Sequence, residues 1–138
     1  MPLLEQVLEK YPRKVKLVFK NYPLRNHKFA EPAAIAAHAA GKQGRFWEFH
    51  DLLFKNYNRL NAQKVEQIAR QLDLDLTRFE KDQKDPRIKA LIRRDLSDAS
   101  RAGVRGTPAV YINGRFLRNR SLSGFRDIIE KELKKLKQ

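Results

Sequence analysis

The chain has 138 residues, enough for one domain with its own core, and 41% of them are hydrophobic, so a disordered chain is excluded. Its 30 lysine and arginine residues against 16 aspartate and glutamate residues give a formal net charge of +14. Their even scatter favours a solvated basic surface over a nucleic-acid-binding protein. No cysteine is present, which excludes disulfides, thiolate metal ligands and thiol chemistry by this chain.

The first twenty residues predict the end of a helix and then a strand. Apolar side chains have helical spacing over residues 3–10, a stretch of about two turns that is too short to be stable alone, so it is expected to be the last part of a helix. Beyond Tyr11-Pro12, the residues Val15, Leu17 and Phe19 alternate with polar neighbours. This period of two predicts a strand over residues 14–20.

The middle of the chain predicts a block of helices. Their expected positions are residues 31–40, 45–57, 61–72, a short stretch around Leu76 and Phe79, and 85–102. Pro32 stands at a first helical position, Gly41 is a natural C-cap and Asn61 a natural N-cap. Residues 45–57 are apolar over much of the helix circumference, so this helix is expected to be well buried.

The stretch from Gly103 to Gly114 predicts a tight loop and a hairpin. Gly106-Thr107-Pro108 forms the loop, and Pro108 is expected to be the first residue of a strand in a special, cis conformation, because proline cannot donate to a ladder. Strands are expected at 109–112 and 115–118 around Asn113-Gly114, the pair that favours a type I′ turn. A last helix follows, capped by a serine, Ser121 or Ser123.

The order of these elements is helix end, strand, helical block, hairpin and helix. It predicts an α/β or α+β arrangement in which the helices are segregated from a small sheet. There is no internal repeat or low-complexity linker, so residues 1–138 are expected to form a single domain.

Four stretches in the same order and with similar spacing resemble the DsbA-like thioredoxin-fold family of thiol-disulfide oxidoreductases. They are residues 15–24, Ala33–Ala40, Gly44–Phe54 and Gly103–Pro108, the last with its strand and Asn-Gly turn. The resemblance covers nearly all of the chain. It implies an α/β thioredoxin-like fold with a helical insertion at about 29–102, and a peptide or protein substrate.

The family pairs a cis-proline with a Cys-x-x-Cys motif that follows a central first strand, and this chain has neither the motif nor the strand. Two explanations are open: an N-terminally truncated form, favoured because Met1 falls within a helical pattern, or a natural redox-dead variant. No catalytic residue is expected in this chain, so an enzyme activity of its own is left open. The missing strand predicts unpaired backbone at residues 14–20. The chain is therefore expected to form a homodimer through strand pairing or segment swapping, or to pair residues 14–20 with 109–112.

The loop Arg105, Gly106, Thr107 and Pro108 is the candidate substrate-binding site. Because proline lacks an N–H, the backbone of Thr107 can pair with an extended peptide by strand addition. The alternative function is a redox-dead basic module that binds peptides, acidic proteins or nucleic acid. No cofactor or metal is expected. No leader or membrane-spanning run is seen, and a periplasmic or extracytoplasmic location is implied only by the family.

The three histidines, His27, His38 and His50, could serve as metal ligands or as acid and base groups. His38 and His50 lack the spacing of a zinc site, and no acidic residue lies three or four positions from His38. Glu48 and Asp51 flank His50, but no activated nucleophile accompanies them. We therefore expect these histidines to pack between helices with hydrogen bonds to their neighbours.

Overall fold

The computed structural model describes residues 2–24 and 27–137; Met1, on which the helical start of the chain was argued, lies outside them. The described residues form two compact units, residues 2–19 with 104–137, and residues 20–24 with 27–103. We call them the hairpin unit and the helical unit. The helical insertion expected at about 29–102 falls within the helical unit.

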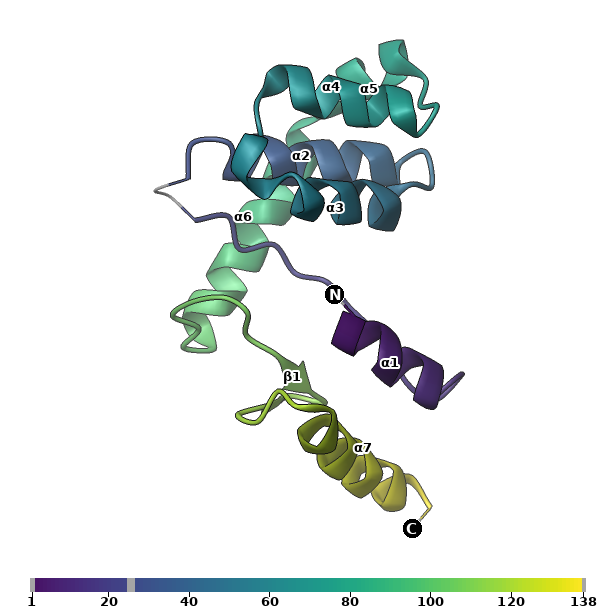
Figure 1. Ribbon diagram of the computed structural model, residues 1–138. Helices are drawn as coiled ribbons and strands as arrows, with labels where there is room; N and C mark the ends of the chain where they lie inside the picture. Colours follow the sequence, from purple (N-terminus) through teal and green to yellow (C-terminus); the bar gives the residue numbers. More distant parts are fainter. Residues whose placement is uncertain (1, 25–26, 138) are drawn as a thin grey trace. The chain divides into compact units, whose positions relative to one another are not determined.

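The hairpin unit consists of two helices and a short antiparallel hairpin (Figure 1). Its elements are α1 (Pro2–Lys10), β1 (Tyr111–Ile112), β2 (Arg115–Phe116) and α7 (Leu122–Leu136). Helix α1 packs against α7, and the Tyr11 hydroxyl donates a hydrogen bond to Glu130 Oε1 at 2.9 Å. Burial and this hydrogen bond to a carboxylate raise the pKa of Tyr11. The core of this unit contains Val7, Tyr11, Leu117, Phe125 and Ile129.

The hairpin turns where the sequence predicts it, but its strands are shorter. Asn113 and Gly114 both have positive φ, 49° and 80°, as a type I′ turn requires. The strands cover residues 111–112 and 115–116 instead of 109–112 and 115–118. One further hydrogen bond continues the ladder, from Leu117 N to Val110 O at 2.8 Å. Pro108 therefore precedes the strand and is not its first residue, since the last hydrogen bond of the ladder is made by Val110.

Helix α7 begins at one of the two serines proposed as its cap. Ser121 is the N-cap, and its Oγ accepts a hydrogen bond from Gly124 N at 3.2 Å. Gly124 is needed here because a Cβ at this position would overlap the backbone carbonyl of Asn119. The loop before α7 is thereby held tightly against its first turn.

Residues 14–20 form no strand, so the predicted strand and its pairing with 109–112 are wrong for this structure. Over residues 2–24 and 27–137, the one strand pairing is that of β1 with β2. Val15 and Leu17 are half-buried and Val18 is exposed, as the alternation predicts, but Phe19, which was expected on the same side as Val15, is exposed. The alternating pattern therefore reports only in part which side chains face the core. It does not supply a neighbouring strand, which backbone pairing requires. Pairing with a second copy of the chain stays a prediction.

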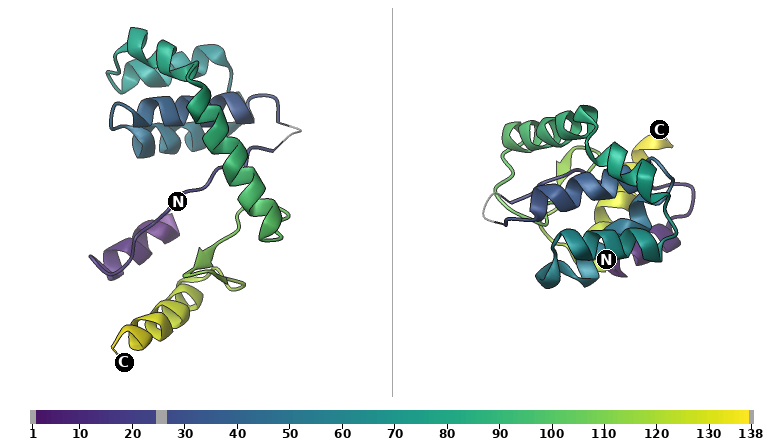
Figure 2. Two further views of the ribbon diagram at one scale, coloured as in Figure 1. Left: turned by 180° about the vertical axis from the view of Figure 1, so that it is seen from behind. Right: turned by 90° about the horizontal axis from the view of Figure 1, so that it is seen from above.

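The helical unit is a layered bundle around α2 (Figures 1 and 2). Its elements are α2 (Ala30–Gly41), α3 (Phe46–Lys55), the 3₁₀ turn η1 (Tyr57–Arg59), α4 (Ala62–Gln71), α5 (Leu76–Gln83) and α6 (Pro86–Arg101). Helix α2 contacts α3, α4, α5 and α6. Its buried alanines, among them Ala36, Ala39 and Ala40, leave room for that close packing. Asn61 and Asp85 cap α4 and α6 as their sequence signals predict.

Helix α3 is less buried than its composition predicts. Phe49 and Leu53 point into the core, whereas Trp47, Phe54 and Tyr57 are exposed. The helix packs against α2 and α4, and a helix buries the stripe that faces its neighbours. The expectation that this helix is well buried therefore holds for the face with Phe49 and Leu53 and is wrong for the face with Trp47 and Phe54.

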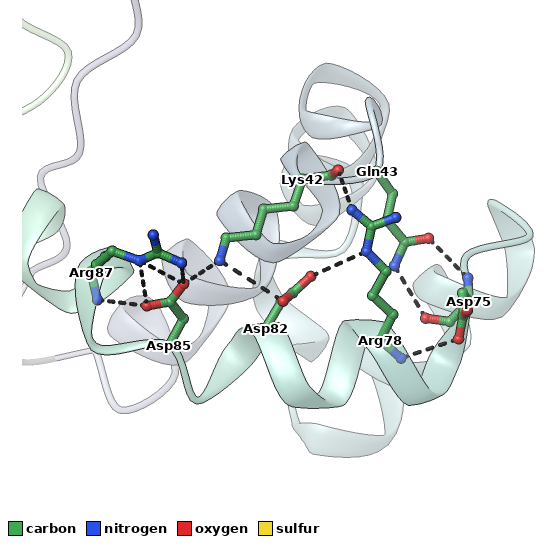
Figure 3. A network of polar contacts seen from close by, with 7 residues as sticks. All are labelled: Lys42, Gln43, Asp75, Arg78, Asp82, Asp85 and Arg87. Carbon is green, nitrogen blue, oxygen red and sulfur yellow. Dashed lines mark hydrogen bonds and ion pairs between the residues drawn. The ribbon is translucent and has the colours of Figure 1, made fainter.

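A polar network ties the end of α2 to α5 and to the start of α6 (Figure 3). Lys42 and Arg87 both contact Asp85, and these hydrogen bonds hold the pKa of that carboxyl well below its ordinary range. Gln43 Oε1 accepts a hydrogen bond from Asp75 N at 2.9 Å, and Gln43 Nε2 donates one to Asp75 O at 3.1 Å. The network joins the ends of three helices, so we assign it a structural role.

Candidate functional site

The predicted site residues Arg105, Gly106, Thr107 and Pro108 form one exposed loop of the hairpin unit. The peptide bond between Thr107 and Pro108 is cis. Gly103, with φ of 77°, ends the turn after α6, and the chain then runs through the loop into β1. All four residues of the candidate site are thus brought together and face solvent.

The loop is anchored from its far side by the hairpin and α7. Arg120 Nη1 donates a hydrogen bond to Pro108 O at 2.7 Å. The Leu117–Val110 hydrogen bond holds the next part of the loop, and the Leu117 side chain is only 2% exposed in the core with Phe125 and Ile129. An exposed loop on a packed base can keep a fixed backbone conformation for a ligand.

The backbone of Thr107 makes no hydrogen bond in the part of the chain that the structure describes. Within residues 2–24 and 27–137, neither its N–H nor its C=O takes part in a hydrogen bond. Pro108 has no N–H that could compete for the same peptide. Such a free donor and acceptor on one exposed residue is the pattern that binds an extended segment by strand addition.

The site lacks a reacting group. The sequence has no cysteine, and among the residues that the structure describes no group of three or more His, Asp or Glu side chains could hold a metal ion. The loop residues carry one hydroxyl, that of Thr107, with no histidine or carboxylate recorded beside it. The loop residues thus carry no thiol.

The histidines lie in the helical unit, and the contacts of His38 and His50 fit the expected packing role, whereas the exposed His27 does not. His50 is buried, with its ring 4.6 Å from that of Phe54 and its Nδ1 3.3 Å from Asp51 Oδ1. Glu48 instead pairs with Arg45 at 3.1 Å. His27 is exposed. Of the two carboxylates that flank His50 in the sequence, that of Asp51 therefore contacts its ring and that of Glu48 contacts Arg45.

His38 belongs to a buried network that sequence patterns did not indicate. Its Nε2 lies 2.8 Å from Asn21 Nδ2 and 3.1 Å from Asn21 Oδ1. Asp95 Oδ2 accepts hydrogen bonds from Asn21 N at 2.9 Å and Asn21 Nδ2 at 2.8 Å. The three residues are 17 and 74 positions apart in sequence, so only the folded chain brings them together. The network joins the segment around Asn21, which precedes α2, to α2 and α6.

Acidification should destabilise the helical unit through His38. Burial lowers the pKa of His38, and the negative charge of Asp95 opposes that effect without cancelling it. A depressed folded-state pKa means that the unfolded chain binds the proton first, so stability is present above the ordinary histidine pKa of about 6.5 and is lost as the pH falls below it. We expect urea denaturation between pH 8 and pH 5 to show this loss, and the His38→Gln variant to show a smaller one.

The exposed His27 supplies the matched control for that experiment. The His27→Gln variant should keep the pH dependence of the parent protein. An unchanged profile in the His38→Gln variant would show that His38 does not contribute.

Comparison with known proteins places the fold in a family. Residues 2–131 match the family model described as thioredoxin. The chain belongs to the thioredoxin family. A solved structure, a thioredoxin-like oxidoreductase from Silicibacter pomeroyi, superposes with a TM-score of 0.82 and 25% identity, over 97% of this chain and 77% of that one. The predicted DsbA-like thioredoxin fold with a helical insertion is thus confirmed.

Curated relatives in this family are longer proteins. The chain is 31% identical over 142 residues to the probable disulfide bond formation protein D of Bacillus anthracis, covering 96% of this chain and 64% of that protein. It is 39% identical over 115 residues to a Na⁺/H⁺ antiporter, NhaA 3, of Salinispora tropica, covering 83% of this chain and 18% of that protein. The chain thus spans less than two thirds of these relatives.

The candidate loop lies within the region that the family model matches. The match to the thioredoxin family model extends through the loop and into α7, to residue 131, so Thr107 and Pro108 lie within the matched region. No helix among the described residues is long and apolar enough to cross a membrane. Arg120 is the contact residue that the sequence did not indicate, because it lies 12 positions from Pro108 and follows the hairpin.

Proposed function

We propose that this member of the thioredoxin family holds an extended peptide segment on the loop Arg105–Pro108 and does not itself exchange disulfides. The observation that carries the proposal is the exposed Thr107 backbone, which has no hydrogen bond within the described part of the chain. A peptide lying alongside Thr107 would complete both groups as a neighbouring strand does.

Binding of this kind is expected to be weak. Each net hydrogen bond contributes about 0.5–1.5 kcal/mol, and the cost of association must be overcome as well. Contacts from the peptide side chains therefore decide which segments bind. A weak, transient complex suits a protein that handles many substrates.

The absence of cysteine defines what the chain does not do. Disulfide exchange at this loop would need a cysteine pair from outside these 138 residues, whether in a longer form of the protein or in another protein. By itself the chain is then either an inactive form of an oxidoreductase or a redox-dead peptide-binding module. The proposed setting is periplasmic or otherwise extracytoplasmic, where substrate disulfides persist.

A titration with peptides tests the proposal. ¹⁵N-labelled protein is mixed with an unstructured peptide and with the same peptide N-methylated at its central amide, which removes one backbone donor. We expect chemical-shift changes at Gly106, Thr107 and Ala109, and at least tenfold weaker binding of the N-methylated peptide. Equal affinities, or shift changes confined to other parts of the chain, would contradict the proposal.

A further inference from the structure

The chain around the loop is basic without local compensation. Residues 104–120 contain four arginines, Arg105, Arg115, Arg118 and Arg120, and no aspartate or glutamate. Among them Arg115 has an acidic neighbour, since its Nε lies 3.7 Å from Glu132 Oε1. The other three are exposed, and no ion pair is found for them among residues 2–24 and 27–137. We call Arg105, Arg118 and Arg120 the arginine rim.

Arg120 is the member of the rim whose position is fixed relative to the loop. Its Nη1 donates to Pro108 O at 2.7 Å, so the guanidinium lies beside the residue that follows Thr107. A guanidinium has five N–H donors in one plane. After the contact with Pro108, others remain that could bind a carboxylate with charge-assisted hydrogen bonds.

The second arginine of the rim follows the end of the hairpin ladder. Tyr111 pairs with Phe116, and the Leu117–Val110 hydrogen bond continues that register by one residue. The next residue, Arg118, is exposed and lies in a bend of the chain. Arg105 lies in the loop itself, two positions before Thr107.

We propose that the loop selects extended peptides that carry a carboxylate next to the residue paired with Thr107, and that Arg120 is the main specificity-determining residue. This inference rests on the proposed function. A peptide is favoured over a nucleic acid because the free groups of Thr107 match a peptide main chain, which a nucleic acid lacks. The uncompensated charge of the arginine rim then selects acidic segments among the peptides that can pair.

The test uses two peptides that differ only by glutamate or glutamine beside the central residue. At low ionic strength the glutamate peptide should bind the wild-type chain about tenfold more tightly, and the difference should shrink as salt is added. The Arg120→Glu variant should lose this preference, and Arg120→Lys should keep part of it, because lysine retains the charge without the planar fork. Binding is measured by fluorescence anisotropy.

Two further variants separate the rim from general charge and from folding effects. Arg118→Glu alters the rim without removing the hydrogen bond to Pro108, and it should also weaken the preference. Lys137→Glu changes the net charge equally at the far end of α7, about 20 Å along the helix from its start, and it should keep the preference. Circular dichroism checks that each variant is folded.

The possible outcomes are distinguishable. Equal binding of both peptides would overturn the selectivity and leave the proposed function standing, whereas no binding of either peptide would overturn both. An equal loss in Lys137→Glu and Arg120→Glu would show unspecific attraction to a basic protein and overturn the assignment to the rim. A single-stranded oligonucleotide that displaces the peptide and loses affinity in Arg120→Glu would identify a nucleic-acid site instead.

Discussion

Replacement of Phe49 by alanine is expected to lower the free energy of unfolding of the helical unit by about 3–5 kcal/mol. The Phe49 side chain is 0% exposed, and its ring centroid lies 5.6 Å from that of Phe79 on α5. Truncation removes buried apolar surface and leaves a cavity that fixed helices cannot fill completely. Urea denaturation followed by the fluorescence of Trp47, the single tryptophan, measures the loss.

Phe54 provides the matched control on the same helix. It is 55% exposed, so Phe54→Ala makes the same chemical change without opening a cavity. We expect a cost below about 1 kcal/mol, since surface substitutions have small effects. Similar costs for the two variants would mean that the assignment of the buried face of α3 is wrong.

Helix α3 also shows how far a sequence pattern can go. Its apolar residues predict a helix at the right place, because spacing and end signals are local properties. They do not reveal that Phe49 faces α5 while Phe54 faces solvent, since apolar residues lie around most of the circumference. Which face becomes buried depends on neighbouring helices that the pattern of one segment does not contain.

The prediction of a strand at residues 14–20 is wrong for a related reason. Val15 and Leu17 are half-buried and their direct neighbours in sequence are exposed. In the part of the chain described, however, no strand lies beside this segment. Alternation reports a local conformation, and a strand needs a second segment with free backbone groups. The prediction of a turn at Asn113-Gly114 is confirmed, because both of its strands adjoin it in sequence.

For the candidate site, too, only the local features could be predicted from the sequence. The loop 105–108 could be predicted because Gly, Thr and Pro in that order constrain the backbone locally. The contact of Arg120 with Pro108 could not, because it needs the hairpin to fold back and bring distant residues together. The network of Asn21, His38 and Asp95 was missed for the same reason, since its members lie in α2, in α6 and in the segment before α2.

Replacement of Asp95 by alanine is expected to cost about 2–3 kcal/mol in the stability of the helical unit. Asp95 is 4% exposed, and its Oδ2 accepts hydrogen bonds from the backbone N and the side-chain Nδ2 of Asn21, which is itself buried. The alanine variant leaves both donors without that acceptor, and a buried donor without a partner loses about 1–3 kcal/mol. The variant should also lower the pKa of His38 further, because the Asp95 charge favours the protonated ring.

Asp98, on the same helix, provides the matched control, because its carboxylate forms a surface ion pair instead of buried hydrogen bonds. Lys20 Nζ lies 2.6 Å from Asp98 Oδ2 and 4.0 Å from Asp95 Oδ1, so both carboxylates share one cation. The Asp98 side chain is substantially exposed, and exposed ion pairs contribute about 0–1 kcal/mol, so Asp98→Ala should have a small effect. If both variants lost the same stability, the attraction to Lys20 would matter more than the hydrogen bonds to Asn21. A large loss of stability in Asp95→Ala alone, together with a shifted His38 titration in NMR, would show that the buried network holds the segment around Asn21 against α2 and α6.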